Sequence, residues 1–223
     1  DTFSNTTNPN TNAVPLNSNT IIVDTTASAL NGLVAAANAN NASASVTPFA
    51  QYQKAGAANA ILENLGAYNS ALNSNTVNGL AVDTTQEVQN LVNAYNTILK
   101  LADGGSTTSQ FASATDYQLI GVTGLNNSSS AVTTDNAQLL SDAIDQKLAV
   151  EVDTVSEIQN LANAVVAVMQ TASGNKILTK VQLEALGVKR VTDANLAAVL
   201  SAIAGTQVNG VANSSAVNSV VDR

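Results

Sequence analysis

Two stretches of the chain carry apolar residues at helical spacing. In both, the apolar positions step by three, one, three, three, one and three residues, which marks one stripe of an α-helix. We therefore predict two amphipathic helices whose stripes are buried. The stripes consist of Val88, Leu91, Val92, Tyr95, Ile98, Leu99 and Ala102, and of Ile158, Leu161, Ala162, Val165, Val168, Met169 and Ala172.

A repeated phrase precedes both stripes. It reads VDTTQEVQNL from Val82 and VDTVSEIQNL from Val152, a shorter copy, VDTTASALNGL, begins at Val23, and another Val-Asp pair begins at Val221. The spacings between these starts are 59, 70 and 69 residues. Such near-equal spacing is typical of tandem structural units.

The phrase itself has the chemistry of a helix start. Thr84 with Glu87, and Thr154 with Glu157, fit the Thr-x-x-Glu capping box, in which each side chain satisfies a backbone N–H of the first turn. The Asp before each Thr is the alternative N-cap. In either case an acidic side chain lies at the positive end of the helix dipole.

Further helices are predicted after the second stripe. After a Gly-Asn turn, the segment TKVQLEALG indicates a short helix from Thr179 to Leu186. The segment VTDANLAAVLSAIAG indicates another helix, which begins at Thr192 or Asp193 and ends near Gly205. One face of that helix carries Leu196, Val199, Leu200 and Ile203.

The two earlier units show the same order of helices with weaker sequence signals. Short helices are expected near Tyr117–Val122 and over Thr133–Ile144. Earlier still, VTPFAQYQKAGAANAILENLG is interpreted as a helix with Thr47 as cap, Pro48 at its first position and Gly66 after its end.

The predicted fold is mainly α, with tandem three-helix units of about 60–70 residues each. The units cover residues 23–81, which diverge most, 82–151 and 152–223. Residues 1–22, rich in Asn and Thr with two Pro, form an extended or disordered polar arm that ends in the strand-like TIIV. The tract 205–220 is expected to be strand-like or irregular.

Composition narrows the picture. Hydrophobic residues make up 45% of the chain but aromatic residues only 3%, with no Trp, so the core consists of small side chains that favour closely packed helices. Charged residues are 11%, less than half the usual share of about 25%. The uncharged Asn- and Thr-rich surface indicates either compositional drift or a surface that packs against copies of itself, where charge repulsion would be unfavourable.

Several function classes are disfavoured. The net charge is −8 and Lys189–Arg190 is the only adjacent basic pair, so we expect no nucleic-acid binding, which needs clustered cations. Without Cys or His, the common zinc, copper and iron sites lack their ligands. We expect no cofactor and no membrane span, because no apolar run approaches the length that a span requires.

Catalysis finds little support in the residues present. A nucleophilic triad lacks its histidine base, and the Ser-Lys alternative at Ser173–Lys176 has the sequence of a turn. Asp142 and Asp145 could in principle form a carboxylate pair, but a solvated helix face explains them better. We therefore predict that the protein is not an enzyme and has no catalytic residues.

Calcium and glycans are the remaining candidate ligands. Asp103 and the Glu151–Asp153 segment each offer two or three oxygens, but neither has the pattern of a calcium loop, and caps and turns explain them more simply. Asn-x-Ser/Thr sequons, which mark glycosylation in an exported protein whose host performs it, occur at Asn5, Asn41, Asn126, Asn127 and Asn213.

The segments VDTVSEIQNL, LEALGV and VTDANLAAVLSAIAG resemble the repeats of very large bacterial surface adhesins and biofilm-associated proteins. The resemblance extends over residues 82–204 and is strongest in the last unit. It implies an extracellular, tandem and mostly structural role at the bacterial cell surface, and it brings no catalytic residues.

We therefore expect a non-enzymatic structural protein: an adhesin or scaffold segment, or a self-assembling fibre or surface-layer subunit. The alternative is a helical-bundle module that recognises a host, matrix or other partner protein. Expected partners are copies of the chain or neighbouring repeats, through residues 1–22 and the C-terminal tract. Both ends fall within a phrase, so we interpret the chain as a processed product or as a fragment of a longer one.

Overall fold

The computed structural model describes residues 25–40, 46–105, 111–125, 136–175, 178–206, 211 and 213–222. This part of the chain is 66% helical, contains ten α-helices and has no β-strand. The prediction of a mainly α protein is therefore confirmed.

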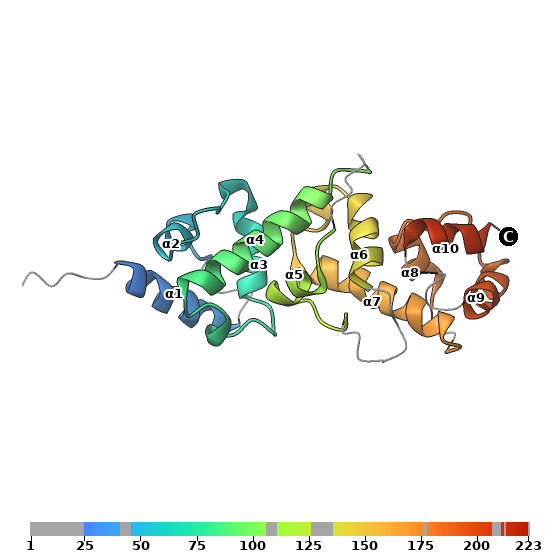
Figure 1. The fold of residues 1–223 in the computed structure, drawn as a ribbon, viewed down its shortest axis with the longest axis horizontal. Coiled ribbons are helices and arrows are strands. Elements are labelled where there is room, and N and C mark those ends of the chain that lie inside the picture. The colour runs from blue at the N-terminus through green and yellow to red at the C-terminus, as the bar shows by residue number, and fades with distance from the viewer. Residues whose placement is uncertain are drawn as a thin grey trace, which may run out of the picture.

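The helices follow one another along the long axis of the molecule, from α1 at one end to α9 and α10 at the other (Figure 1). Short 3₁₀ helices precede α3, α4 and α7. The bounds are α1 Thr25–Ala39, α2 Phe49–Lys54, η1 Leu62–Asn64, α3 Leu65–Leu72, η2 Gly79–Ala81, α4 Thr85–Leu101, α5 Ala114–Leu119, α6 Asn136–Asp145, η3 Ala149–Glu151, α7 Val155–Ala172, α8 Lys180–Ala185, α9 Leu196–Ala204 and α10 Ser214–Val221.

The two predicted stripes belong to α4 and α7, and every residue of both stripes is buried. Both capping boxes are also present. The Thr84 hydroxyl accepts the Glu87 N–H at 3.2 Å, and the Glu87 carboxylate accepts the Thr84 N–H at 3.0 Å. Thr154 and Glu157 exchange the same bonds at 3.3 and 3.0 Å. The threonine, and not the preceding aspartate, is the N-cap in both helices.

The short helices α2, α5 and α8 are each six residues long and end in the same turn. A glycine with positive φ follows each one: 96° at Gly56, 99° at Gly121 and 75° at Gly187. The N–H of the residue after each glycine donates to the carbonyl five positions earlier, at 2.9–3.0 Å. This is the closure that a glycine in the left-handed region permits at a helix end.

A buried polar side chain on α3 binds the segment that leads into α2. The Asn69 side chain accepts the Thr47 N–H at 3.1 Å and donates to the Thr47 carbonyl at 3.1 Å. The Tyr52 hydroxyl, buried on α2, donates to the same amide oxygen at 3.3 Å. Buried backbone groups that no helix satisfies thereby find partners.

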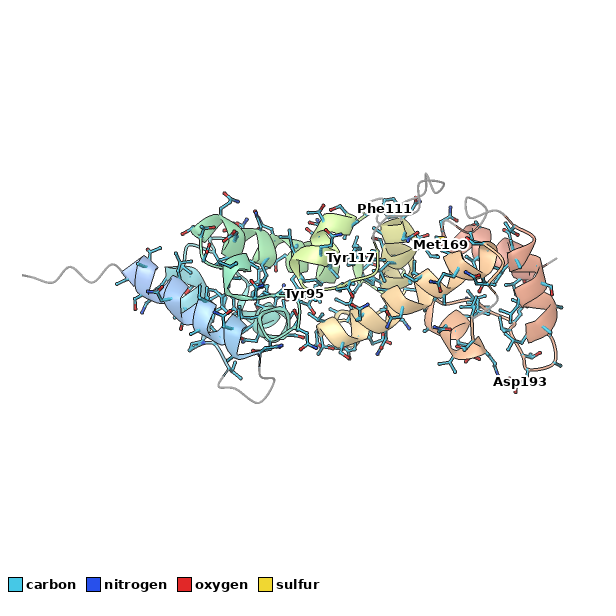
Figure 2. The ribbon with its side chains drawn as sticks, turned by 90° about the horizontal axis from the view of Figure 1, so that it is seen from below. Tyr95, Phe111, Tyr117, Met169 and Asp193 are labelled. Atoms are coloured by element: carbon cyan, nitrogen blue, oxygen red, sulfur yellow. The ribbon has the colours of Figure 1, made fainter. Side chains whose placement is uncertain are left out.

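The same arrangement occurs between α5 and α6. The Ser141 hydroxyl accepts the Ala112 N–H at 3.2 Å and donates to the Ala112 carbonyl at 3.3 Å. Tyr117 of α5 lies 2.9 Å from that hydroxyl and points into the body of the molecule (Figure 2). At the matching place on α8, five residues before Val188, the buried side chain is the apolar Leu183.

Two predicted helix ends need correction. The helix with Thr47 as cap does not continue to Gly66: α2 begins after Pro48, which is its N-cap, and closes at Gly56, while Gly66 lies inside α3. The α-helix predicted from Thr192 begins at Leu196. Thr192 still caps the turn before it, since it exchanges two bonds with Asn195, at 2.6 and 3.2 Å.

The tract 205–220 is not simply strand-like or irregular, because α10 begins within it at Ser214 and runs to Val221. Asn213 caps this helix, accepting the Ala216 N–H at 2.8 Å. The predicted short helix Thr179–Leu186 is confirmed as α8. The arm 1–22, the phrase start at Val23 and the predicted helix start at Thr133 lie outside the described residues.

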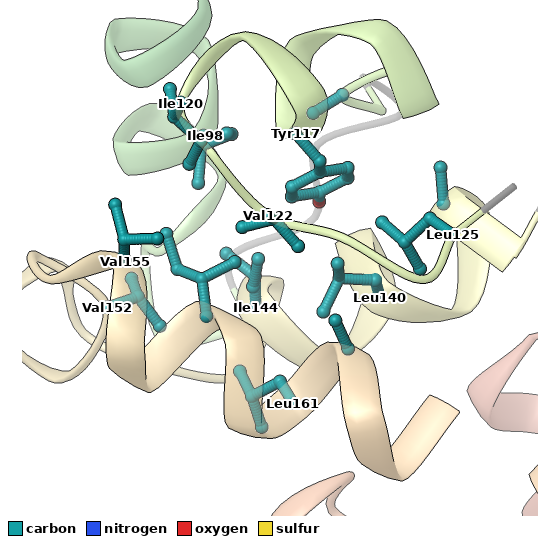
Figure 3. Close-up of a cluster of buried hydrophobic side chains, with 14 of the residues drawn as sticks. Ile98, Tyr117, Ile120, Val122, Leu125, Leu140, Ile144, Val152, Val155 and Leu161 are labelled. Carbon is teal, nitrogen blue, oxygen red and sulfur yellow. The ribbon is translucent and has the colours of Figure 1, made fainter. Parts of the chain in front are cut away.

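The buried side chains form one continuous hydrophobic cluster that includes residues of every α-helix. Its middle is the joint at which α4, α5, α6 and α7 meet (Figure 3). The residues labelled there are Ile98, Tyr117, Ile120, Val122, Leu125, Leu140, Ile144, Val152, Val155 and Leu161. Val152, the first residue of the repeated phrase, is therefore one of the buried side chains that pack at this joint.

Candidate functional site

A groove lies between α3, the turns after α3 and α5, and the first half of α7. Its volume is about 830 Å³, within the range of about 300–1,000 Å³ of ligand pockets. The lining residues are Val46, Gly66, Asn69, Ser70, Asn73, Ser74, Asn75, Thr76, Gly121, Thr123, Val155, Ser156, Gln159, Asn160 and Asn163.

Helical spacing places these side chains on facing walls. On α3, residues 66, 69, 70 and 73 recur at intervals of three or four, so they share one face. On α7, residues 156, 159, 160 and 163 do the same. Apolar residues of both helices turn into the core, and the polar residues are left to line the groove.

Hydrogen bonds join the walls. The Val155 N–H, at the start of α7, donates to the Ser70 hydroxyl on α3 at 2.9 Å. The Thr76 hydroxyl donates to the Gly121 carbonyl at 2.6 Å. These two bonds connect segments that are 85 and 45 positions apart in the sequence.

Two carboxamide side chains in the groove each bind both backbone polar groups of one residue, accepting its N–H and donating to its carbonyl. Gln159 accepts the Thr123 N–H at 2.9 Å and donates to the Thr123 carbonyl at 3.2 Å. Asn69 holds Thr47 in the same way. A carboxamide carries a donor and an acceptor side by side, and therefore matches the two polar groups of a peptide backbone.

Three other polar side chains of the groove make no hydrogen bond to another described residue. Asn73, which is half-buried, and Ser156 and Asn160, which are exposed, make no side-chain hydrogen bond within the described part of the chain. Asn73 lies one helical turn beyond Asn69 on α3, and Asn160 follows Gln159 on α7. The groove thus offers free donors and acceptors next to side chains that already clamp backbone.

The groove lining contains no charged side chain and no aromatic ring. The nearest acidic groups lie at the α7 start. Burial, followed by the charge of Glu157, raises the pKa of Asp153. Burial, together with the carboxylates of Asp153 and Glu157, raises the pKa of the Tyr95 phenol, while the Ser70 hydroxyl lowers it. None of these groups is among the lining residues, so the lining offers neutral hydrogen bonds and the apolar Val46 and Val155.

The described candidates for catalysis, Ser173, Asp142 and Asp145, do not line the groove. Ser173 is the C-cap of α7, and Lys176 lies outside the described residues. Asp142 and Asp145 are on α6, away from the groove lining. The structure therefore does not place these residues in a shared cavity.

The two calcium candidates act as turn residues. Asp103 pairs with Leu148 in an antiparallel bridge, and the Glu151 carboxylate accepts the Leu148 N–H at 2.8 Å. Among the described residues, no three acidic side chains gather where they could hold a metal ion.

The remaining predicted residues also have structural contacts. Of the sequons, Asn213 is the cap of α10, and those at Asn5, Asn41, Asn126 and Asn127 lie outside the described ranges. Arg190 of the basic pair binds Asp222 at 3.0 Å on the surface. In the described part of the chain, no helix is long and apolar enough to cross a membrane.

Comparison of the chain with protein-family models, with curated proteins and with solved structures finds no match. The groove was not predicted from the sequence. One signal was present: carboxamide residues four positions apart, as in Asn69–Asn73 and, on the polar side of a predicted helix, Gln159–Asn163. In so Asn-rich a chain, that signal is hidden in the composition.

Proposed function

We propose that the chain is a non-enzymatic structural protein of a bacterial surface, built from tandem three-helix units at residues 23–81, 82–151 and 152–223. It serves as an adhesin or scaffold segment, or as a self-assembling fibre or surface-layer subunit. The first two units each consist of a long helix, a six-residue helix and a third helix that contacts the next long helix, and the last unit contains α10 in addition to α7, α8 and α9.

The recurring geometry of the short helices is the observation that carries this proposal. The same glycine turn closes α2, α5 and α8, and the same tyrosine-to-polar contact recurs at Tyr52–Asn69 and Tyr117–Ser141. Units that bury their hydrophobic faces on their neighbours extend in one direction. Such an array provides length and surface, which are what a scaffold needs.

The surface chemistry supports the same role. With 11% charged residues and a net charge of −8, the surface consists mainly of uncharged polar groups that present little repulsion to a second copy. The resemblance of residues 82–204 to adhesin and biofilm-protein repeats supports an extracellular location. Head-to-tail contacts between such units are heterologous, so they need not close and can form threads.

Electron microscopy of the purified chain, combined with sedimentation over a range of concentrations, tests the proposal. We expect threads, rods longer than one chain, or sheets, and a sedimentation coefficient that rises with concentration. Compact monomers at every concentration would contradict self-assembly. Removal of residues 1–22 should reduce assembly if the arm contributes to it.

A helical-bundle binding module is the second candidate, and a specific observation favours it. Leu80 in η2 and Val150 in η3 are 77% and 72% exposed, and both lie two residues before the Val of the repeated phrase. Two large apolar side chains exposed at matching places would suit contact with a host or matrix protein. In that case Leu80→Ser with Val150→Ser would abolish binding to immobilised matrix proteins and leave assembly unchanged.

A further inference from the structure

We propose that the groove between α3 and α7 binds an extended, uncharged peptide segment, namely residues 2–22 of the N-terminal arm of a second copy of the chain. The inference rests on the proposed assembling function and identifies the contact that would join two copies. Its evidence is the hydrogen-bonding pattern of the groove and the composition of that segment.

The groove has the chemistry to recognise peptide backbone. Its own Gln159 and Asn69 each hold one backbone residue through an N–H and a carbonyl at 2.9–3.2 Å. The unused carboxamides of Asn73 and Asn160 are of the same kind. Backbone recognition does not depend on the side chains of the bound segment, so a low-complexity Asn- and Thr-rich sequence is an acceptable partner.

The absence of charge in the lining restricts the ligand. A carboxylate or an ammonium group entering the groove would lose water without meeting an opposite charge among the lining residues, which is unfavourable. The lining also lacks an aromatic ring on which a sugar face would stack. A neutral chain with many donors and acceptors and a few small apolar side chains fits best.

Residues 2–22 have that composition. Positions 2–23 contain no Asp, Glu, Lys or Arg, although the net charge of the chain is −8. Pro9 and Pro15 disfavour a helix and favour extended backbone around them. At about 3.3 Å per residue, 22 extended residues reach up to about 70 Å, which is enough to leave one copy and enter the groove of the next.

Disulfide trapping tests the contact with the full chain, because the chain has no native cysteine. Two variants of the full chain are mixed. The first variant carries Ser4→Cys or Ser18→Cys in the arm. The other carries Ser156→Cys, which lines the groove, or Ser201→Cys, which is exposed on α9 and serves as the matched control. Different affinity tags on the two variants identify the mixed dimer after mild oxidation.

We expect the mixed dimer to form several-fold faster with Ser156→Cys than with Ser201→Cys. Adding Asn73→Ala and Asn160→Ala to the Ser156→Cys chain should remove that advantage without changing its melting temperature, since neither side chain has a hydrogen bond to lose. Equal rates for the groove and control cysteines would overturn the proposal.

Parallel microscopy of the parent chain separates this inference from the proposed function. Threads or sheets without preferential trapping would overturn the groove contact and leave the structural role intact. Absence of both would contradict both proposals. A neutral oligosaccharide can be added to the chain while the NMR resonances of the Asn73 and Asn160 side-chain amides are recorded. If the oligosaccharide shifts these resonances and the arm cannot be trapped, the groove binds a glycan, and the peptide inference is overturned.

Discussion

The Tyr117 hydroxyl lies 2.9 Å from the Ser141 hydroxyl, and both side chains are buried between α5 and α6. Ser141 also binds both backbone groups of Ala112. A short side chain therefore satisfies both backbone polar groups of Ala112 and also contacts the Tyr117 hydroxyl. Asn69 does the same for Tyr52 and Thr47.

Ser141→Ala should therefore destabilise the protein more than Tyr117→Phe does. The alanine variant leaves the Ala112 N–H and carbonyl without their side-chain partner, which costs about 1–3 kcal/mol. The phenylalanine variant leaves the Ser141–Ala112 bonds intact and should cost about 1 kcal/mol. Urea unfolding curves measure both. If the two variants unfold at the same urea concentration, the bonds to Ala112 contribute nothing.

Two glycines form a matched pair for testing the turn after α5. Gly121 has a φ of 99°, and a Cβ there would lie 2.1 Å from the Ser74 hydroxyl oxygen. Gly66 lies inside α3, and a Cβ there would meet nothing within 4 Å. Gly121→Ala should lower the free energy of unfolding by more than about 1 kcal/mol. Gly66→Ala should leave it unchanged or raise it by up to about 1 kcal/mol.

The glycine pair also reports on the groove. Ser74 and Thr76 form one wall, and Thr76 donates to the Gly121 carbonyl. Gly121→Ala should therefore slow trapping of the arm at Ser156→Cys. A Gly121→Ala chain as stable as the Gly66→Ala chain would show that the turn does not need its left-handed backbone.

Two carboxylates at helix starts should respond to pH in opposite directions. The Thr84 side chain and backbone lower the pKa of Glu87, so its contribution is present above its unfolded pKa and is lost as pH falls through the folded value. Burial raises the pKa of Asp153, so its ionisation destabilises the fold as pH rises above the ordinary value of 3.8. Both side chains lie near the surface, and the effects should be small.

Melting temperatures measured from pH 3 to pH 7 check these signs. At pH 7, Glu87→Gln should melt below the parent chain and Asp153→Asn above it. At pH 3, where the carboxyls are largely protonated, both differences should shrink. An Asp153→Asn variant that melts below the parent at pH 7 would contradict the assigned cause of the Asp153 shift.

Features encoded over short distances could be predicted from the sequence. The stripes of α4 and α7, and their caps at Thr84 and Thr154, follow from spacings of three and four residues. The predicted extent of α2 is wrong because the helix ends at Gly56 and not at Gly66. Gly56 closes α2 with the same turn that Gly121 forms after α5. In α10, valines suggested a strand, but Asn213 at the cap position was the better local signal.

The groove could not be predicted, because its walls are far apart in the sequence. The bond between Val155 and Ser70 spans 85 positions, and no local pattern indicates that α3 and α7 meet. The buried polar contacts also join residues that are far apart in the sequence. Ser141 and Asn69 look like ordinary polar residues of amphipathic helices until the backbone of Ala112 and Thr47 is placed against them.

The start of the repeated phrase has nearly identical backbone geometry in its two described copies. Val82 has φ and ψ of −145° and 23°, and Val152 has −142° and 23°. The following caps also agree, with −121° and 152° at Thr84 and −119° and 146° at Thr154. One copy could therefore replace the other without a change in chain direction.

Deletion of residues 82–151, which joins Ala81 directly to Val152, tests most directly whether the chain is an array of equivalent units. Because α3 contacts both α4 and α7, α7 can take the place of α4 in the shortened chain. We predict a mainly helical circular dichroism spectrum and a single cooperative urea transition. A shortened chain that is unfolded, or that is helical without a cooperative transition, would contradict the tandem-unit account.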